Sequence, residues 1–126
     1  MFNRVNPLMV IVNGGKCDVG FYVAADKSCQ VREYLSGLDS RYRLRLQVLA
    51  EQLAQMGKIK NPMSFRHQQG DIWGFELADQ HRVACFQHGL VWVCTHAFHK
   101  NDKWKSSDFA TANRIRVDFL SRVDQG

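Results

Sequence analysis

The sequence predicts an α+β fold in which a mostly antiparallel sheet of four to six strands packs against an αα-hairpin and a C-terminal helix. Three successive runs between residues 72 and 98 are dominated by β-branched and aromatic residues, which favour strands. Between residues 31 and 56, and again after residue 106, apolar residues recur at helical spacing instead. With 126 residues, the chain is expected to form a single domain over 1–126.

The three strand-like runs form the centre of the predicted sheet. They are Ile72–Leu77, Arg82–Gln87 and Leu90–Phe98. We expect His88 and Gly89 to form the turn between the last two, because glycine accepts the positive φ of a tight hairpin. This register places His81 opposite His96 at the far end of the pair.

Shorter segments complete the predicted sheet. Leu8–Val12 and Val19–Ala24 are expected to form an N-terminal hairpin around a turn that contains two glycines. Met63–Phe65 is a candidate further strand, and the polar segment Arg66–Gly70 follows it.

The predicted helices have amphipathic patterns. Ser28 is a candidate N-cap for the first, which continues to Leu38. The second should stop at Gly57, and its apolar stripe is Tyr42, Leu46, Leu49, Leu53 and Met56. Because such stripes must be buried, we expect both helices to cover the sheet. A final helix capped by Ser106 or Ser107 buries Phe109, Ala112, Phe119 and Val123, and leaves Arg114, Arg116 and Arg122 to solvent or a ligand.

The composition excludes several classes of protein. The chain is 45% hydrophobic, so it can bury a core rather than remain disordered. It has no apolar run of the ~18 residues that a membrane span needs, and its N-terminal apolar patch is too short for a signal peptide. We therefore expect a cytoplasmic protein without a membrane partner. The net charge of +5 is typical either of a solvated basic surface or of a polyanionic partner, nucleic acid or an acidic protein.

The four cysteines, Cys17, Cys29, Cys85 and Cys94, form no CxxC pair. In the predicted register Cys85 and Cys94 are diagonal neighbours, which is a poor geometry for a disulfide, so we expect buried reduced thiols. A metal site formed by Cys94, His96 and His81 is the alternative. No metal and no cofactor are expected.

Several segments share their order and pattern with a known family. DKSCQVREYLSGLD and LQVLAEQLAQMG are similar to its first helix and to its second helix ending in glycine. RVACFQHGLVWVCTHAFHK is similar to its R-v-x-F and t-H-x-F-x-K strands, and ATANRIR to its last helix. The chain thus resembles the RelE/HigB superfamily of type II toxin–antitoxin toxins, in particular its phage-derived HigB-like branch. The resemblance covers residues 21–122, so we expect an N-terminal extension over 1–20 and a RelE-like core over 21–126.

The resemblance implies a cleft at the open face of the sheet and a toxin that inhibits translation. Such a toxin is an mRNA endoribonuclease (an mRNA interferase) that cuts ribosome-bound mRNA. Its partners are the mRNA, the ribosome and a cognate antitoxin, typically of helix-turn-helix type. Cleavage in the family needs no metal: a base activates the ribose 2′-hydroxyl, cations stabilise the phosphorane, and an acid protonates the leaving 5′-oxygen.

Position by position, the resemblance implies catalytic roles for Arg82, His96 and Lys100. Arg82 would stabilise phosphate charge, whereas His96 and Lys100 would act as acid/base and phosphate-binding groups. The candidates for RNA binding are Lys58, Lys60, Arg66, Trp104 and Lys105. Trp104 would either stack on a base or pack beneath the last helix.

The chain departs from the family on the first central strand, where the pattern is [aromatic]-E-l-[R/K]. Ala78 stands in the place of the cation, or Glu76 if the register is shifted by two. Strand parity also predicts that Arg82 and His96 lie on opposite faces unless a bulge intervenes. The missing cation supports an alternative function, a catalytically degenerate RelE-like protein that binds a protein or a nucleic acid.

Overall fold

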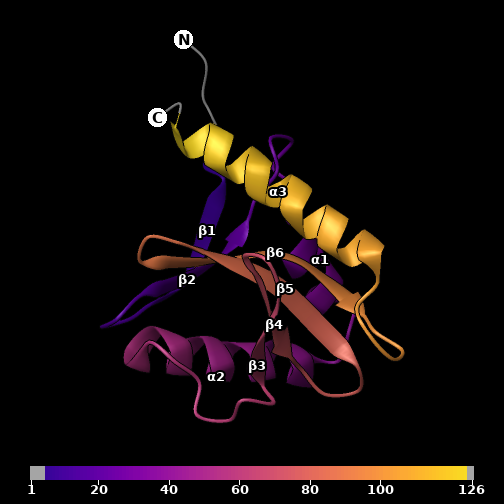
Figure 1. The fold of residues 1–126 in the computed structure, drawn as a ribbon. Coiled ribbons are helices and arrows are strands. Elements are labelled where there is room, and N and C mark those ends of the chain that lie inside the picture. The colour runs from indigo at the N-terminus through magenta and orange to yellow at the C-terminus, as the bar shows by residue number, and fades with distance from the viewer. Residues whose placement is uncertain (1–4, 125–126) are drawn as a thin grey trace.

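The chain folds into one six-stranded sheet with helices on both faces, in a computed structural model that describes residues 5–124 (Figure 1). The strands are β1 Leu8–Asn13, β2 Asp18–Tyr22, β3 Phe65–Gln69, β4 Ile72–Glu76, β5 His81–His88 and β6 Val91–His99. The helices are α1 Gln30–Ser36, α2 Ser40–Met56 and α3 Ser106–Asp124. The strand order is β1-β2-β6-β5-β4-β3, and the neighbouring pairs are antiparallel apart from β2 and β6. The predicted α+β class, the mostly antiparallel sheet and the C-terminal helix are confirmed.

Each face of the sheet has its own hydrophobic core. On one face, α1 and α2 bury Val31, Leu35, Tyr42, Leu46, Leu49 and Leu53 against the strands. On the other face, α3 buries Ala112, Ile115 and Phe119 (Figure 1). The predicted stripe of α2 is wrong at its end, because Met56 is 55% exposed.

The helix ends follow local side-chain chemistry. α1 begins one residue later than expected, with Cys29 rather than Ser28 at the N-cap. The Asp39 side chain caps α2 by accepting a hydrogen bond from the Arg41 N–H at 3.0 Å. α2 ends at Gly57, as predicted.

The N-terminal hairpin is present, because β1 pairs antiparallel with β2. Residues 8–13 and 18–20 of the predicted extension therefore contribute backbone to the sheet, whereas residues 1–4 lie outside the described part. The prediction for β3 is wrong: the strand begins at Phe65 and includes the polar residues that follow. It is an edge strand paired with β4 alone, so polar side chains along it face solvent.

The β5–β6 hairpin is shifted by two residues from the predicted register. His88 pairs with Val91, so the turn consists of Gly89 and Leu90. Gly89 has φ +59 at the first turn position, where a two-residue hairpin of type II′ requires glycine. As a result Cys85 lies directly opposite Cys94 rather than diagonal to it.

The helices of residues 5–124 are all too short or too polar to cross a lipid bilayer.

Candidate functional site

A bulge in the β5–β6 ladder decides which of the predicted site residues share a face. The register passes from Cys85 opposite Cys94 to Ala84 opposite His96, so Thr95 is an extra residue. An extra residue reverses the alternation of side chains. Arg82 and His96 therefore both lie on the face covered by α3, which corrects the expectation from an unbulged strand.

Arg82 is held within the sheet by a carboxylate. Glu76 lies opposite it on β4, and Arg82 Nε is 3.1 Å from Glu76 Oε1. The N–H of Nε is not aligned for a hydrogen bond, so this attraction is mainly Coulombic. Arg82 Nη1 also donates to the carbonyl oxygen of His81 at 3.0 Å. The side chains of Arg82 and Glu76 are 9% and 15% exposed, so the positive charge expected to bind phosphate is neutralised inside the protein.

His96 is buried beneath α3, with 6% of its surface exposed and its ring stacked on Phe98. The Thr95 hydroxyl donates to the Ala84 carbonyl oxygen at 3.3 Å and lies 3.2 Å from His96 Nδ1. Which atom donates in the contact between Thr95 and Nδ1 depends on which ring nitrogen of His96 carries the proton. Nε2 has no hydrogen-bond partner among residues 5–124. Burial lowers the pKa of His96 to about 4, so the ring is neutral at pH 7.

A cavity of about 240 Å³ lies beside His96. β2 pairs with β6 only as far as Phe21 opposite Cys94, and the rest of β6 has no strand neighbour on that side. Gln30, at the start of α1, compensates by bonding the carbonyl oxygen and the N–H of Ala97 at 2.8 and 2.6 Å. The early end of β2 is thus the reason why a hollow forms against β6.

The first half of α3 closes the other side of this cavity. Thr111, Arg114 and Ile115 line it from the helix. Arg114 forms no ion pair with a carboxylate of the described residues, unlike Arg116 and Arg122. Sequence periodicity left these three arginines equivalent, and only the packing of α3 distinguishes Arg114.

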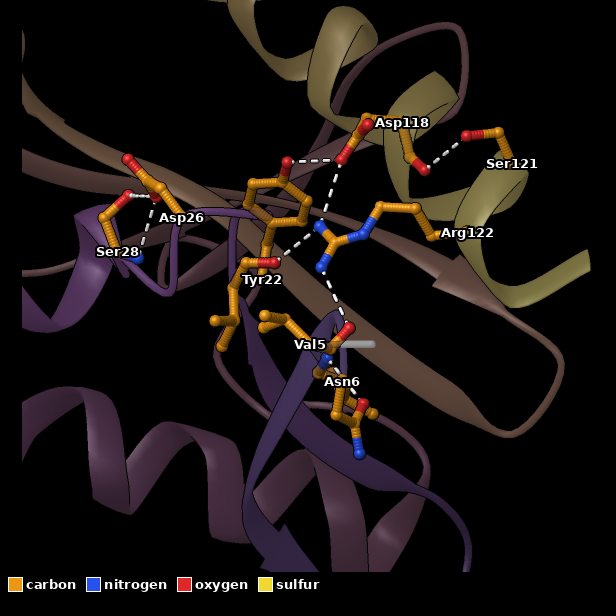
Figure 2. Close-up of polar contacts among 10 residues, drawn as sticks. Val5, Asn6, Tyr22, Asp26, Ser28, Asp118, Ser121 and Arg122 are labelled. Atoms are coloured by element: carbon orange, nitrogen blue, oxygen red, sulfur yellow. Dashed lines mark hydrogen bonds and ion pairs between the residues drawn. The ribbon is translucent and has the colours of Figure 1, made fainter. Parts of the chain in front are cut away.

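A polar network fixes α3 above the sheet at this point (Figure 2). The Tyr22 hydroxyl donates to Asp118 at 2.5 Å, and Arg122 donates to the same carboxylate at 3.1 Å. Arg122 also donates to the carbonyl oxygens of Val23 and Val5, at 2.7 and 3.1 Å. The Tyr22 hydrogen bond lowers the pKa of Asp118, so the network is charge-assisted. Arg122 is therefore a structural residue rather than a free cation.

A second polar group lies at the opposite end of β5 from the Gly89 turn. Asp79 and Gln80 join β4 to β5 with positive φ values of 57 and 68. The Asp79 carboxylate accepts hydrogen bonds from the Tyr42 hydroxyl at 2.5 Å and from Arg41 at 2.9 Å. The Gln80 carbonyl oxygen accepts the backbone N–H of Lys100 at 2.8 Å. This turn therefore connects the start of α2 with the end of β6.

Two imidazoles meet beside this turn. His81 lies opposite His99, not opposite His96 as predicted, and the two ring centroids are 5.1 Å apart. The Tyr34 hydroxyl lies 2.7 Å from His81 Nδ1 and fixes the orientation of that ring. Partial burial, and then the nearby His99, lower the pKa of His81. The structure thus brings together two groups able to transfer protons, and Lys100 follows His99 in the chain.

Three of the predicted RNA-binding residues lie away from this group. Lys58 and Lys60 are in the loop between α2 and β3, and Arg66 is exposed on β3. β4 and β5 separate β3 from β6, and Lys100 comes directly after β6 in the chain. The structure therefore does not gather all the predicted cations at one place.

Trp104 and Lys105 have different environments although they are neighbours in the chain. Trp104 is 8% exposed and stacks on Phe109 at 5.3 Å, so it packs with the last helix and is not presented to a base. Lys105 is exposed just before α3.

Within residues 5–124, no three His, Cys, Asp or Glu side chains are arranged to hold a metal ion. In particular, Cys94 lies in the core beneath α1 and α2, whereas His96 faces α3. All four cysteines are buried free thiols, as expected, and burial raises the pKa of Cys85 and of Cys94.

Comparison of the sequence with protein-family models and with curated proteins finds no match. The function of the chain must therefore be inferred from its own residues and fold.

Proposed function

We propose that this chain is the toxin of a type II toxin–antitoxin pair, built on a RelE-like scaffold and acting on ribosome-bound mRNA. The observation that carries the proposal is the connectivity. β2 leads through α1 and α2, which are joined by residues 37–39, to the antiparallel strands β4, β5 and β6, and β6 lies parallel to β2. This order is what the family resemblance implies, with β1 and β3 as added edge strands. A cognate antitoxin with a helix-turn-helix domain would be the partner.

In the proposed reaction, His81 and His99 are the acid and base. One imidazole removes the proton of a ribose 2′-hydroxyl, whose oxygen attacks the adjacent phosphorus. The bond from phosphorus to the 5′-oxygen breaks, and the other imidazole donates the proton that this oxygen takes up. The products are a 2′,3′-cyclic phosphate and a 5′-hydroxyl, and Lys100 offsets the extra negative charge of the phosphorane. His96 and Arg82 were sequence-based candidates, but both are buried and Arg82 is paired with Glu76, whereas His99 is exposed and His81 and Lys100 are half-buried.

Expression of the chain in a bacterial host tests this function. We expect growth arrest and new mRNA 5′-hydroxyl ends, both lost in His81→Gln and Lys100→Gln. Lys103→Gln is the matched control, because it removes a lysine from the same exposed connection at a position without a proposed role. Normal growth and intact mRNA in cells that contain soluble wild-type protein would refute the nuclease.

The second candidate is a catalytically degenerate RelE-like protein that binds a protein or a nucleic acid without cutting. The Glu76–Arg82 ion pair favours it, because the arginine that the family uses for phosphate is already neutralised. Ala78 provides no replacement charge. Binding of RNA or of an antitoxin by purified protein that leaves mRNA intact is the result expected for this alternative.

A further inference from the structure

Another cavity, of about 300 Å³, lies between β2, α1 and α2, on the face of the sheet that α3 does not cover. Its size is at the lower end of the ~300–1,000 Å³ range of pockets that hold small molecules. Phe21 of β2 and Leu35 of α1, both largely buried, line its inner side. Arg32 and Ser36 of α1 and Arg43 of α2 line it as well, and all three are exposed. The cavity is therefore open to solvent on a side that carries two cations.

The two arginines that line this cavity have no carboxylate partner. Most of the other arginines that the structure describes near a carboxylate form ion pairs with it, namely Arg41, Arg82, Arg116 and Arg122. Within residues 5–124, Arg32 and Arg43 form no ion pair, although Glu33 is next to Arg32 in the chain. Two positive charges beside one hollow repel each other, and an anion bound between them would replace this repulsion by attraction.

The donors around the cavity favour phosphate over carboxylate. A carboxylate has two oxygens, and a single guanidinium can occupy both through parallel hydrogen bonds. A phosphate monoester has three terminal oxygens and a charge of about −1.5 to −2 at pH 7, so it can bind two guanidiniums at once. The Ser36 hydroxyl already donates to the Glu33 carbonyl oxygen at 2.9 Å, so the two arginines supply the donors for an anion.

We propose that this cavity binds a phosphate monoester, whose phosphate pairs with both Arg32 and Arg43. A phosphorylated small molecule and the 5′-phosphate end of an RNA both carry this group. The site goes beyond the proposed nuclease and does not depend on it, because none of the residues that line the cavity contacts His81.

The test is titration of the full-length protein, labelled with ¹⁵N in arginine, by nuclear magnetic resonance of the arginine side chains. The probes are phenyl phosphate and phenylacetate, which carry the same ring on a phosphate and on a carboxylate. We expect phenyl phosphate to move the Nε resonances of Arg32 and Arg43 to saturation. Phenylacetate should bind at least about tenfold more weakly, because it has fewer oxygens and a smaller charge.

A further titration distinguishes the two sources of the phosphate. The probe is a short RNA whose 2′-hydroxyls are methylated to prevent cleavage, prepared with and without a 5′-phosphate. Given binding of phenyl phosphate, tighter binding of the 5′-phosphorylated RNA at Arg32 and Arg43 would assign the site to an RNA end. Equal binding of the two RNAs would assign it to a phosphorylated small molecule.

Three variants separate the cavity from the general charge of the helices. Arg32→Gln and Arg43→Gln should each weaken phenyl phosphate binding at least about tenfold, because each removes charge-assisted hydrogen bonds. Both variants should fold like the wild type, since the two side chains are exposed and form no ion pair within the described part of the chain. Arg45→Gln removes the same charge from α2 but lies outside the cavity, so it should bind phenyl phosphate like the wild type.

Unmoved resonances of Arg32 and Arg43 with phenyl phosphate would overturn the proposal. Equal weakening in Arg43→Gln and Arg45→Gln would also overturn it, as would phenylacetate binding as tight as that of phenyl phosphate. Growth arrest by the wild type combined with unmoved resonances would reject this site while leaving the proposed nuclease intact.

Discussion

Glu76 and Arg82 should stabilise the fold only when both are present, because either charge alone would be buried without a partner. In Glu76→Leu the Arg82 side chain would stay 9% exposed and lose its carboxylate, while the hydrogen bond to the His81 carbonyl oxygen remains. Removal of one partner of a buried pair costs about 3–5 kcal/mol, and the retained hydrogen bond places our expectation near ~3 kcal/mol. For a chain of this length that is a fall in melting temperature of roughly 10 °C. The double variant Glu76→Leu/Arg82→Met should recover to within about 1 kcal/mol of the wild type, because no buried charge is left.

Urea denaturation followed by circular dichroism measures these free energies of unfolding. Asp71→Ala is the control, since its pair with Arg116 is 68% exposed on the aspartate side and should be worth less than about 1 kcal/mol. A loss in Glu76→Leu no larger than in this control would refute a buried ion pair. So would a double variant as unstable as the single one.

Two further predictions concern the α3 side of the sheet. His96 has a pKa of about 4 in the folded protein against 6.5 for the free side chain, so the unfolded state binds more protons between these values. Stability should therefore fall as the pH is lowered from 6.5 to 4, by up to roughly 3 kcal/mol. His96→Phe should remove this dependence and be equally or more stable at pH 7. Urea denaturation of both proteins at pH 7 and pH 5 tests it, and an equal loss of unfolding free energy in the two proteins would contradict the prediction. In Gly74→Ala the new Cβ would lie 2.3 Å from Trp104 Cζ2, so we expect a loss of about 1–3 kcal/mol and an altered near-ultraviolet spectrum. The control is Gly15→Ala, whose new Cβ would have no atom within 4 Å. Equal stability of the two variants would exclude the close packing of Trp104 on β4.

The elements that sequence patterns predict best are those whose signal lies within one segment. The stripe of α2 and its stop at Gly57 are examples, because helical periodicity and a left-handed C-cap are local properties. β3 was misplaced because an edge strand buries few side chains and its polar residues resemble a loop. The prediction of the site was less accurate, because a register shift of two residues and the bulge at Thr95 changed both the cross-strand partner of His96 and the face of the sheet on which it lies.

The sequence alone determined the fold class, the helix stripes, the buried thiols and the presence of imidazoles and cations around the two central strands. The hydrophobicity and the backbone propensity of a residue are properties of that residue, so they can be assessed without knowing which segment it packs against. Tertiary structure alone decided that Glu76 neutralises Arg82, that His81 faces His99, and that α3 covers His96 beside a cavity with Arg114. These relations join segments far apart in the chain, and strand register and helix packing set them, not the pattern within any one segment.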